Sequence, residues 1–414
     1  MLKMNKNLLK ALVLTSVIVA PMATVVSCGK TKPVDNRINV AYITSRESTL
    51  ADPYNREISN ASEAATEAVD ARYKAFVNPN HDDYEKHKEF IKTLVDRKAS
   101  LVIEPGYRSS KVILDDAQNF PETIFLGVSY SKDIINDKGG DDRKHELQNT
   151  TLYESLRNIG SIVAKRQEQG FLTGYLSASK YFTDHATEGT SQVNAVNFST
   201  IGTTAFQDTS AMMDGYIAGV NQYAAENSKF VKLIAPKADG TFFTNAWFHH
   251  LSEFNQANKN AVAYLKTQNV KLLFPSDLNA VKHYDKNGFT LVADYATYND
   301  SIQDVVVWSK QKWNQIMKTA VASALKNKLT FNREYHAQTH LASFKNNELE
   351  LVKSSKFDFS KELSQKAADA LKQWNIDNRT DPKYSTIDAH ENETMDGTCK
   401  GAFWIVDFSD INNN

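Results

Sequence analysis

The chain has 414 residues, with 48 lysines and arginines against 49 aspartates and glutamates. A balance this close to neutral lacks the basic surface that nucleic-acid binding requires, so we expect no nucleic-acid partner. The length exceeds what one hydrophobic core usually serves, so we expect two lobes. The cysteines, Cys28 and Cys399, are too few for a zinc site built on thiolates.

The first 27 residues have the pattern of a bacterial export segment. Lysines precede an almost unbroken apolar run at residues 11–26, which at about 16 residues falls short of the ~20 that span a bilayer comfortably. The run ends in Val-Val-Ser-Cys at Cys28, which resembles a lipobox, although leucine is commoner where Val25 stands. A plain secretory peptide or an uncleaved anchor is the alternative interpretation.

We favour the lipobox interpretation. It predicts a signal peptide at residues 1–27, lipidation of Cys28, a tether at 28–37 and anchoring at the extracellular face of the cell membrane through this lipid alone. Loss of the signal peptide would leave 45 basic against 49 acidic side chains. A lipidated Cys28 could form no disulfide, so we expect Cys399 to be an inert thiol.

The first half of the chain alternates short apolar runs with helical spacing. Such alternation is typical of a parallel sheet covered by helices on both faces, a doubly wound α/β lobe. Ligands of such sheets bind beyond the carboxyl ends of the strands, so residues 104–107 are expected at the mouth of a site, unless they form only a turn. We expect strands at residues 38–43, 71–77, 101–103 and 124–128, with helices near 58–69, 81–97 and 112–120.

The second half restarts the same pattern after a charged stretch at residues 129–151 that we interpret as a surface insertion. Gly170 and Gly174 lie four apart on one expected helix, so that face can approach the sheet closely. A long amphipathic helix is expected at 305–327. We expect strands at 158–163, 195–199, 231–235, 270–274, 289–293 and 349–352, and further helices at 167–179, around 212–219, at 253–266 and at 363–374.

Motifs of the common enzyme classes do not occur. The chain has no G-x-S-x-G, no P-loop, no G-x-G-x-x-G and no H-E-x-x-H, so we predict no catalytic residue, no cofactor and no metal site. His81, His87 and the pair 249–250 lack a nearby acid at helix spacing, and we interpret them as surface histidines. The paired carboxylates 82–83 and 115–116 are interpreted as solvated.

Several segments, taken together, resemble the basic membrane protein family, the lipoprotein substrate-binding components of ABC transporters that include purine nucleoside receptors. The best match is the run E-Q-G-F-L-T-G-Y, which begins at Glu168 and resembles the family's E-G-S-F-L-A-G-Y. The other matching segments are D-P-Y-N at 52–55, the strand and helix at 102–125, the glycines at 215 and 219, L-V-A-D at 291–294, and Ser309 with Lys312.

The resemblance implies a type I periplasmic-binding-protein-like fold, α/β, with two doubly wound lobes joined by a hinge. It implies lobe 1 at residues 38–157 and 305–335, lobe 2 at 158–304 and 336–357, and a charged C-terminal extension at 358–414. A monomer would bind a nucleoside, of purine type, between the lobes and dock on an ABC permease. The sequence departs from the family where Ser129 replaces an acid and where the loop after Ser199 lacks two glycines.

The expected ligand site needs a flat apolar surface for the base and carboxylates for the ribose. Tyr54 can stack and Asn55 can read a base edge. Asp52 can accept from an N–H, although capping the next helix is an even alternative. Asp294, after a strand, can accept two ribose hydroxyls, where a turn residue is the competing interpretation. The family match alone favours Lys312.

Three aromatic residues and one serine complete the prediction. Tyr107, Phe206 and Trp247 are candidate lids, for which core packing competes, and Ser276 is a weaker candidate. Two other functions are also consistent with the sequence. One is a surface lipoprotein that keeps the fold for adhesion or another protein interaction, and the other is a surface nucleoside hydrolase.

Overall fold

The computed structural model describes most of the chain from residue 38 onward. The described residues are 38–45, 53–78, 83–106, 112–129, 155–186, 194–202, 207–234, 254–275, 281–294, 302–326, 330–331, 338–354, 357 and 359–378. None of the helices within these ranges is long and apolar enough to cross a membrane. The predicted signal peptide, the predicted lipidation site Cys28, and Cys399 lie outside the described residues.

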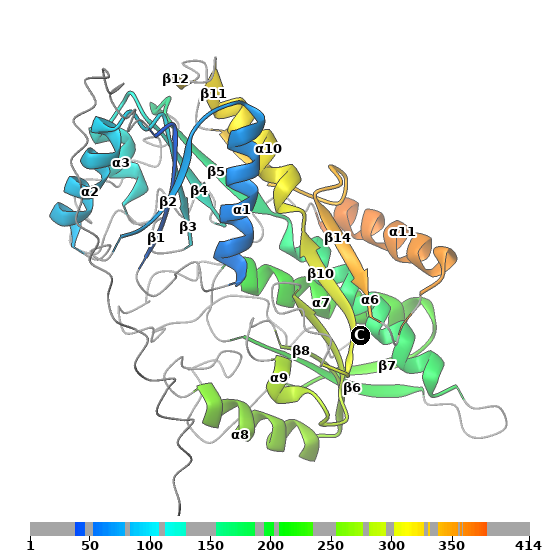
Figure 1. Ribbon diagram of the computed structural model, residues 1–414. Helices are drawn as coiled ribbons and strands as arrows, with labels where there is room; N and C mark the ends of the chain where they lie inside the picture. The colour runs from blue at the N-terminus through cyan, green and yellow to red at the C-terminus, as the bar shows by residue number, and fades with distance from the viewer. Residues whose placement is uncertain are drawn as a thin grey trace, which may run out of the picture. The chain divides into compact units, whose positions relative to one another are not determined.

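The first sheet has six parallel strands in the order β13-β5-β4-β3-β1-β2 (Figure 1). Apolar side chains alternate between its two faces, as the strand period requires. Val40 and Tyr42 face one cluster, while Ala41 and Ile43 face another. The strands are β1 (Val40–Ser45), β2 (Tyr73–Asn78), β3 (Leu101–Pro105), β4 (Ile124–Val128), β5 (Ile159–Ala164) and β13 (Gln338–Ala342).

Within the described residues, four helices cover this sheet, two on each face. One face packs on α2 and α3, and the other packs on α1 and α10. These helices are α1 (Pro53–Ala68), α2 (Tyr84–Asp96), α3 (Ile113–Asn119) and α10 (Trp313–Ala324). A short hairpin, β11 (Leu325–Lys326) with β12 (Thr330–Phe331), follows α10.

The second sheet repeats the order of the first, β14-β10-β9-β8-β6-β7, with β14 antiparallel to β10. Its strands are β6 (Ala195–Ile201), β7 (Phe230–Leu233), β8 (Val270–Pro275), β9 (Thr290–Asp294), β10 (Val305–Gln311) and β14 (Leu349–Lys353). One face packs on α6 (Arg166–Asp184), α7 (Gln207–Glu226) and α11 (Lys361–Asn378), and the other on α8 (Phe254–Thr267) and α9 (Val281–Tyr284). The predicted α/β fold with two doubly wound sheets is confirmed.

In the part of the chain that the structure describes, the backbone passes between the two sheets three times. It crosses at Lys165 before α6, at Lys312 before α10, and through residues 343–348 between β13 and β14. Lys165 and Lys312 have nearly the same backbone conformation, with φ −73 and ψ 72 for the first and φ −86 and ψ 72 for the second. The N–H of Lys165 donates to Ala342 O at 2.8 Å, and that of Lys312 donates to Glu348 O at 2.7 Å. The third crossing is therefore hydrogen-bonded to the first crossing at its beginning and to the second crossing at its end.

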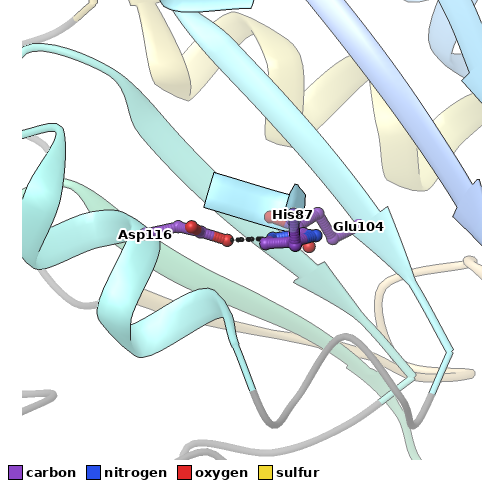
Figure 2. A group of neighbouring side chains, drawn as sticks. All are labelled: His87, Glu104 and Asp116. Carbon is purple, nitrogen blue, oxygen red and sulfur yellow. Dashed lines mark hydrogen bonds and ion pairs between the residues drawn. The ribbon is translucent and has the colours of Figure 1, made fainter. Parts of the chain in front are cut away.

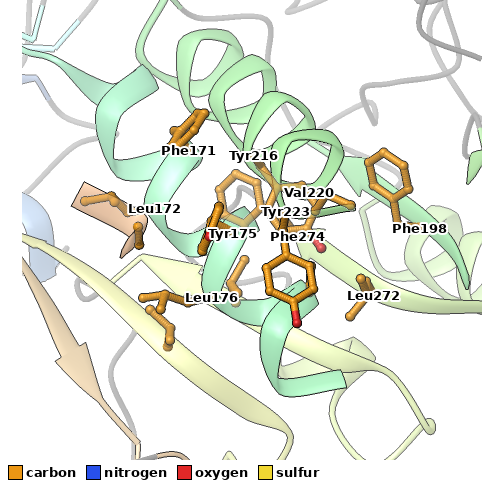
Figure 3. Packing of buried hydrophobic residues seen from close by; sticks show 14 of the residues in the cluster. Phe171, Leu172, Tyr175, Leu176, Phe198, Tyr216, Val220, Tyr223, Leu272 and Phe274 are labelled. Atoms are coloured by element: carbon orange, nitrogen blue, oxygen red, sulfur yellow. The ribbon is translucent and has the colours of Figure 1, made fainter. Parts of the chain in front are cut away.

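Helices α6 and α7 pack backbone against backbone. A Cβ on Gly170 or Gly174 would overlap the carbonyl oxygen of Met212 or Tyr216, respectively, and Gly215 and Gly219 meet α6 in the same way. Large aromatic side chains pack around this helix–helix contact, among them Phe171, Tyr175, Tyr216 and Phe274 (Figure 3). The glycine face predicted from the sequence therefore exists, but it approaches another helix and not the sheet.

Two other predictions differ from the structure. The expected helix at 305–327 is wrong: its first part is strand β10, and α10 begins only at Trp313. Val305–Val307 is β-branched and buried, as an interior strand requires, and no glycine or proline separates it from the helix. The expected lobe boundaries also shift, because β5 and β13 belong to the first sheet and β10 belongs to the second.

Candidate ligand-binding site

Tyr54 lies in the first turn of α1, just after the carboxyl end of β1, where parallel sheets bind ligands. Its ring meets the edge of Trp313 with centroids 5.5 Å apart and an interplanar angle of 86°. Its hydroxyl contacts the Ser129 hydroxyl at the end of β4. Ser129 is thus engaged with a predicted site residue.

Asn55 is directed into the first lobe. Its side chain is buried, and its Oδ1 and its backbone carbonyl accept from the Tyr42 hydroxyl at 3.2 and 3.0 Å. This contact fixes the start of α1 on β1. A role for Asn55 in reading a base stays a prediction.

Asp294 ends strand β9 and is 8 % exposed. One of its oxygens forms an ion pair with the guanidinium of Arg166, which is itself buried in the first turn of α6. Arg166 also donates to Gln169 Oε1 at 2.6 Å. The carboxylate predicted to accept ribose hydroxyls is therefore held in place and balanced by a cation from the first crossing.

Glu57 lies one helical turn beyond Tyr54 on α1 and is partly buried. Burial raises the pKa of its carboxyl above the ordinary value; the charges of Lys310 and Arg56 offset part of this, and the carboxylate of Asp294 adds to it. Positions three apart share one face of a helix. Glu57 thus brings a carboxyl within electrostatic range of Asp294, and the ring of Tyr54 lies on the same face of α1 as Glu57.

Lys312 is held at the second crossing. Its ammonium donates to Asn347 Oδ1 at 2.7 Å and lies 3.4 Å from Glu350 Oε2. Both partners belong to the third crossing or to β14, so the described contacts of Lys312 tie the crossings together. They do not bring it to Tyr54 or Asp294.

The structure adds site residues that the sequence did not single out. Trp313 is 4 % exposed, and its indole N–H has no hydrogen-bond partner within the described residues. These added residues all lie near a strand end or a crossing: Trp313, Arg166, Glu57 and Lys310. Their position along the chain was the only indication of a site role that the sequence offered. Five predicted residues lie outside the described part of the chain: Asp52, Tyr107, Phe206, Trp247 and Ser276.

A second group of polar side chains is buried within the first lobe. His87 of α2, Glu104 of β3 and Asp116 of α3 are each fully buried and face one another (Figure 2). His87 Nε2 lies 2.6 Å from Asp116 Oδ2. Burial raises the pKa of Glu104 well above its ordinary value, and the charge of Asp116 raises it further.

This group overturns three predictions. His87 was interpreted as a surface histidine, Asp115 and Asp116 as solvated, and Glu104 as part of the mouth of a site, yet all four are buried. Their partners come from other elements, and residue spacing within a single helix does not show such pairs. Asp83, in contrast, is exposed and caps α2 through the N–H of Lys86 at 3.2 Å.

Known proteins resemble the chain in fold and not in sequence. No protein-family model and no curated protein sequence matches it. An ABC transporter solute-binding protein from Conexibacter woesei covers 82% of the chain and 97% of its own length, with a TM-score of 0.52 and 14% identity. One from Aeropyrum pernix covers 87% and 95%, with a TM-score of 0.51 and 12% identity.

A third neighbour is a transcriptional activator of the comK gene from Bacillus halodurans, with a TM-score of 0.52, 14% identity, and coverage of 81% of this chain and 97% of its own. The type I periplasmic-binding-protein fold is therefore shown. Two of these three neighbours are solute-binding proteins of ABC transporters, the third is a transcriptional activator, and none of the three carries the name of an enzyme.

Proposed function

We propose that this protein is a lipid-anchored solute-binding protein at the extracellular face of the cell membrane, and that it presents a purine-type nucleoside to an ABC permease. The main support is the aromatic pair of Tyr54 and Trp313, which lies on the same side of α1 as Glu57. Glu57 in turn is close enough to Asp294 for the charge of Asp294 to raise its pKa. A nucleoside needs both parts, because its base is flat and apolar and its ribose carries hydroxyls.

The aromatic pair supplies the base subsite. Base stacking on an aromatic ring contributes about 1–3 kcal/mol in nucleic-acid-binding proteins. The buried indole N–H of Trp313 supplies a donor, since buried donors are normally paired and this one has no partner in the described part of the chain. A purine nitrogen is an acceptor that suits it.

The ion pair supplies the ribose subsite. A carboxylate accepts two hydroxyl hydrogens, and the guanidinium of Arg166 offsets the cost of holding the charge of Asp294 away from water. Arg166 starts α6 directly after the first crossing. Ligand bound at Asp294 is thereby coupled to a crossing, as hinge closure on a ligand requires.

The test compares two tyrosines in a binding titration with guanosine, adenosine, inosine and free ribose. Tyr54→Leu removes the ring that would stack on the base. Tyr73→Leu is the matched control, because Tyr73 packs on the same cluster and its hydroxyl also meets a serine, Ser59, at 2.6 Å. We expect Tyr54→Leu to lose roughly tenfold to a hundredfold in nucleoside affinity.

The control should bind as the wild-type chain does, with a comparable loss of stability. Equal affinity in both variants, or no binding of any nucleoside by a folded wild-type chain, would refute the proposal. In that case the second candidate, a surface lipoprotein that uses the fold for protein interaction, would be preferred. The contact between Tyr54 and Ser129, at a position where the family has an acid, is the observation in its favour.

A further inference from the structure

Three elements of the first lobe bring metal-binding side chains together away from the proposed ligand site. His87 comes from the first turn of α2, Glu104 from the penultimate position of β3, and Asp116 from α3. One ligand atom from each lies within 4.8 Å of the other two (Figure 2). A divalent ion with tetrahedral bonds of about 2.0–2.2 Å holds its ligand atoms roughly 3.3–3.6 Å apart. Binding would therefore replace the direct 2.6 Å contact of His87 with Asp116 by two bonds to the ion.

The burial of these groups makes their charge expensive. All three side chains are fully buried, and two of them are carboxylic acids. Two carboxylates beside one imidazole carry net negative charge into a medium that solvates it poorly. Proteins offset such a charge with a proton or with a cation.

Asn78 gives the histidine the support that metal-bound histidines usually have. Its Nδ2 lies 2.8 Å from His87 Nδ1, at the end of β2, and it is also fully buried. A side-chain amide presents either an N–H or a carbonyl oxygen when it rotates. It can therefore donate to Nδ1 while Nε2 holds a hydrogen, and accept from Nδ1 when Nε2 binds a metal.

We propose that His87, Glu104 and Asp116 form a binding site for one divalent transition-metal cation, with Zn²⁺ the best match. Imidazole with two carboxylates is a ligand set that zinc accepts, with water as the fourth ligand. Mn²⁺ is the second choice because it favours oxygen ligands, and Mg²⁺ keeps its waters too firmly for a dry three-ligand pocket. The bound ion would fasten α2 and α3 to the end of β3.

The test measures metal binding by the full chain without a histidine tag. The protein is stripped with EDTA and titrated with ZnCl₂, MnCl₂ and MgCl₂ in a calorimeter, and bound metal is counted by elemental analysis. We expect one tight equivalent of Zn²⁺, weaker Mn²⁺ and no Mg²⁺. Asn78→Ala should weaken the zinc site by roughly 10–100-fold, the usual effect of losing such a supporting contact.

Two shape-preserving variants identify the ligands. Glu104→Gln and Asp116→Asn each replace a carboxylate by an amide of the same size and should lose the tight equivalent. Glu104→Gln removes a buried charge, so it is expected to fold, and a cooperative thermal transition verifies this. The matched control is His340→Asn, which alters the histidine 2.8 Å from the buried Glu348 at the third crossing and should keep the zinc equivalent.

The site is refuted if the stripped wild-type chain takes up no stoichiometric metal, since the group is then stable without a bound ion. It is equally refuted if both amide variants keep the tight equivalent, because the ion must then bind elsewhere. Neither result depends on nucleoside binding.

Discussion

The two lobes contain equivalent helix pairs, but the two helices pack against each other differently in each lobe. In each lobe the helix after the first strand packs on the helix that follows a crossing, α1 on α10 and α7 on α6 (Figure 1). The α6–α7 pair meets through glycines, with backbone against backbone. The α1–α10 pair meets through side chains, including the edge-on contact of Tyr54 and Trp313.

The α6–α7 interface is therefore fixed by backbone contact, whereas side chains at the α1–α10 interface can change conformation. Backbones in direct contact leave no side chain between α6 and α7 that could turn toward a ligand. The first residues of the two crossing helices also differ, because Arg166 starts α6 and Trp313 starts α10. The second lobe thus offers a charged group at this position, and the first lobe offers an aromatic one.

The largest effect is expected from Arg166→Met. It leaves Asp294 buried without its cation, so the free energy of unfolding should fall by about 3–5 kcal/mol, as when one partner of a buried ion pair is lost. Urea unfolding at neutral pH measures it. The double variant Arg166→Met with Asp294→Asn should recover most of the loss, and a double variant as unstable as the single one would show that the charge is not the cause.

A slightly smaller effect is expected from Gly174→Ala. The added Cβ overlaps the backbone of Tyr216, which cannot rotate away, so we expect a loss of about 3 kcal/mol, the upper part of the usual range for overpacking. Ala320→Ser also adds one heavy atom, but on α10 within the cluster of the first lobe that packs through side chains, and should cost about 1 kcal/mol. Similar losses in both variants would remove the distinction between the two interfaces.

A small effect on stability is expected from Trp313→Phe. The indole N–H has no hydrogen-bond partner in the described structure, so its removal should change the free energy of unfolding by less than about 1.5 kcal/mol. Thermal unfolding of the variant beside wild type checks this. A loss of several kcal/mol would mean that the N–H forms a bond in the free protein and is not a donor kept for a ligand.

The smallest effect is expected from Glu57→Gln, and it depends on pH. The folded state raises the pKa of Glu57, so it binds this proton more tightly than the unfolded chain does. Wild-type stability should therefore fall, relative to the variant, as the pH rises through the pKa of the unfolded carboxyl and up to that of the folded one. The two proteins should be equally stable below that window, and Glu57→Gln should be slightly more stable at neutral pH.

Unfolding curves at pH 3 and pH 7 provide the measurement for Glu57. A variant that is less stable than wild type at pH 7 would show that the attraction of Lys310 outweighs burial. That outcome would make Glu57 part of a stabilising ion pair between an α1 side chain and β10.

Local patterns predicted most of the fold. Residues 101–103 and Ile124–Val128 are short apolar runs that are buried on both faces, and the sequence analysis placed them correctly within β3 and β4. Strand β13 was missed because it is polar, Gln-Thr-His-Leu-Ala, and lies at the edge of its sheet. Strand β10 was missed because its apolar residues continue without a break into those of α10.

The sites were less predictable, because they depend on contacts between distant segments. Asp294 was expected just after a strand and is the last residue of β9, but its partner Arg166 is 128 positions away in sequence. The same is true of His87 and Asp116, which belong to different helices. The residue type does not show whether a charged side chain is buried or solvated, and its partner is known only from the tertiary structure.

The position of β13 has a consequence for how the protein is made. Strand β5 lies between β4 and β13, so the first sheet is complete only when residues 338–342 have been synthesised, after nearly all of the second lobe. Until then Ile159–Ala164 is an exposed apolar edge, which invites pairing with another chain. Native pairing over such a separation in sequence is also slow to form. A newly made chain therefore depends on holding this one strand apart from its neighbours until its last partner arrives.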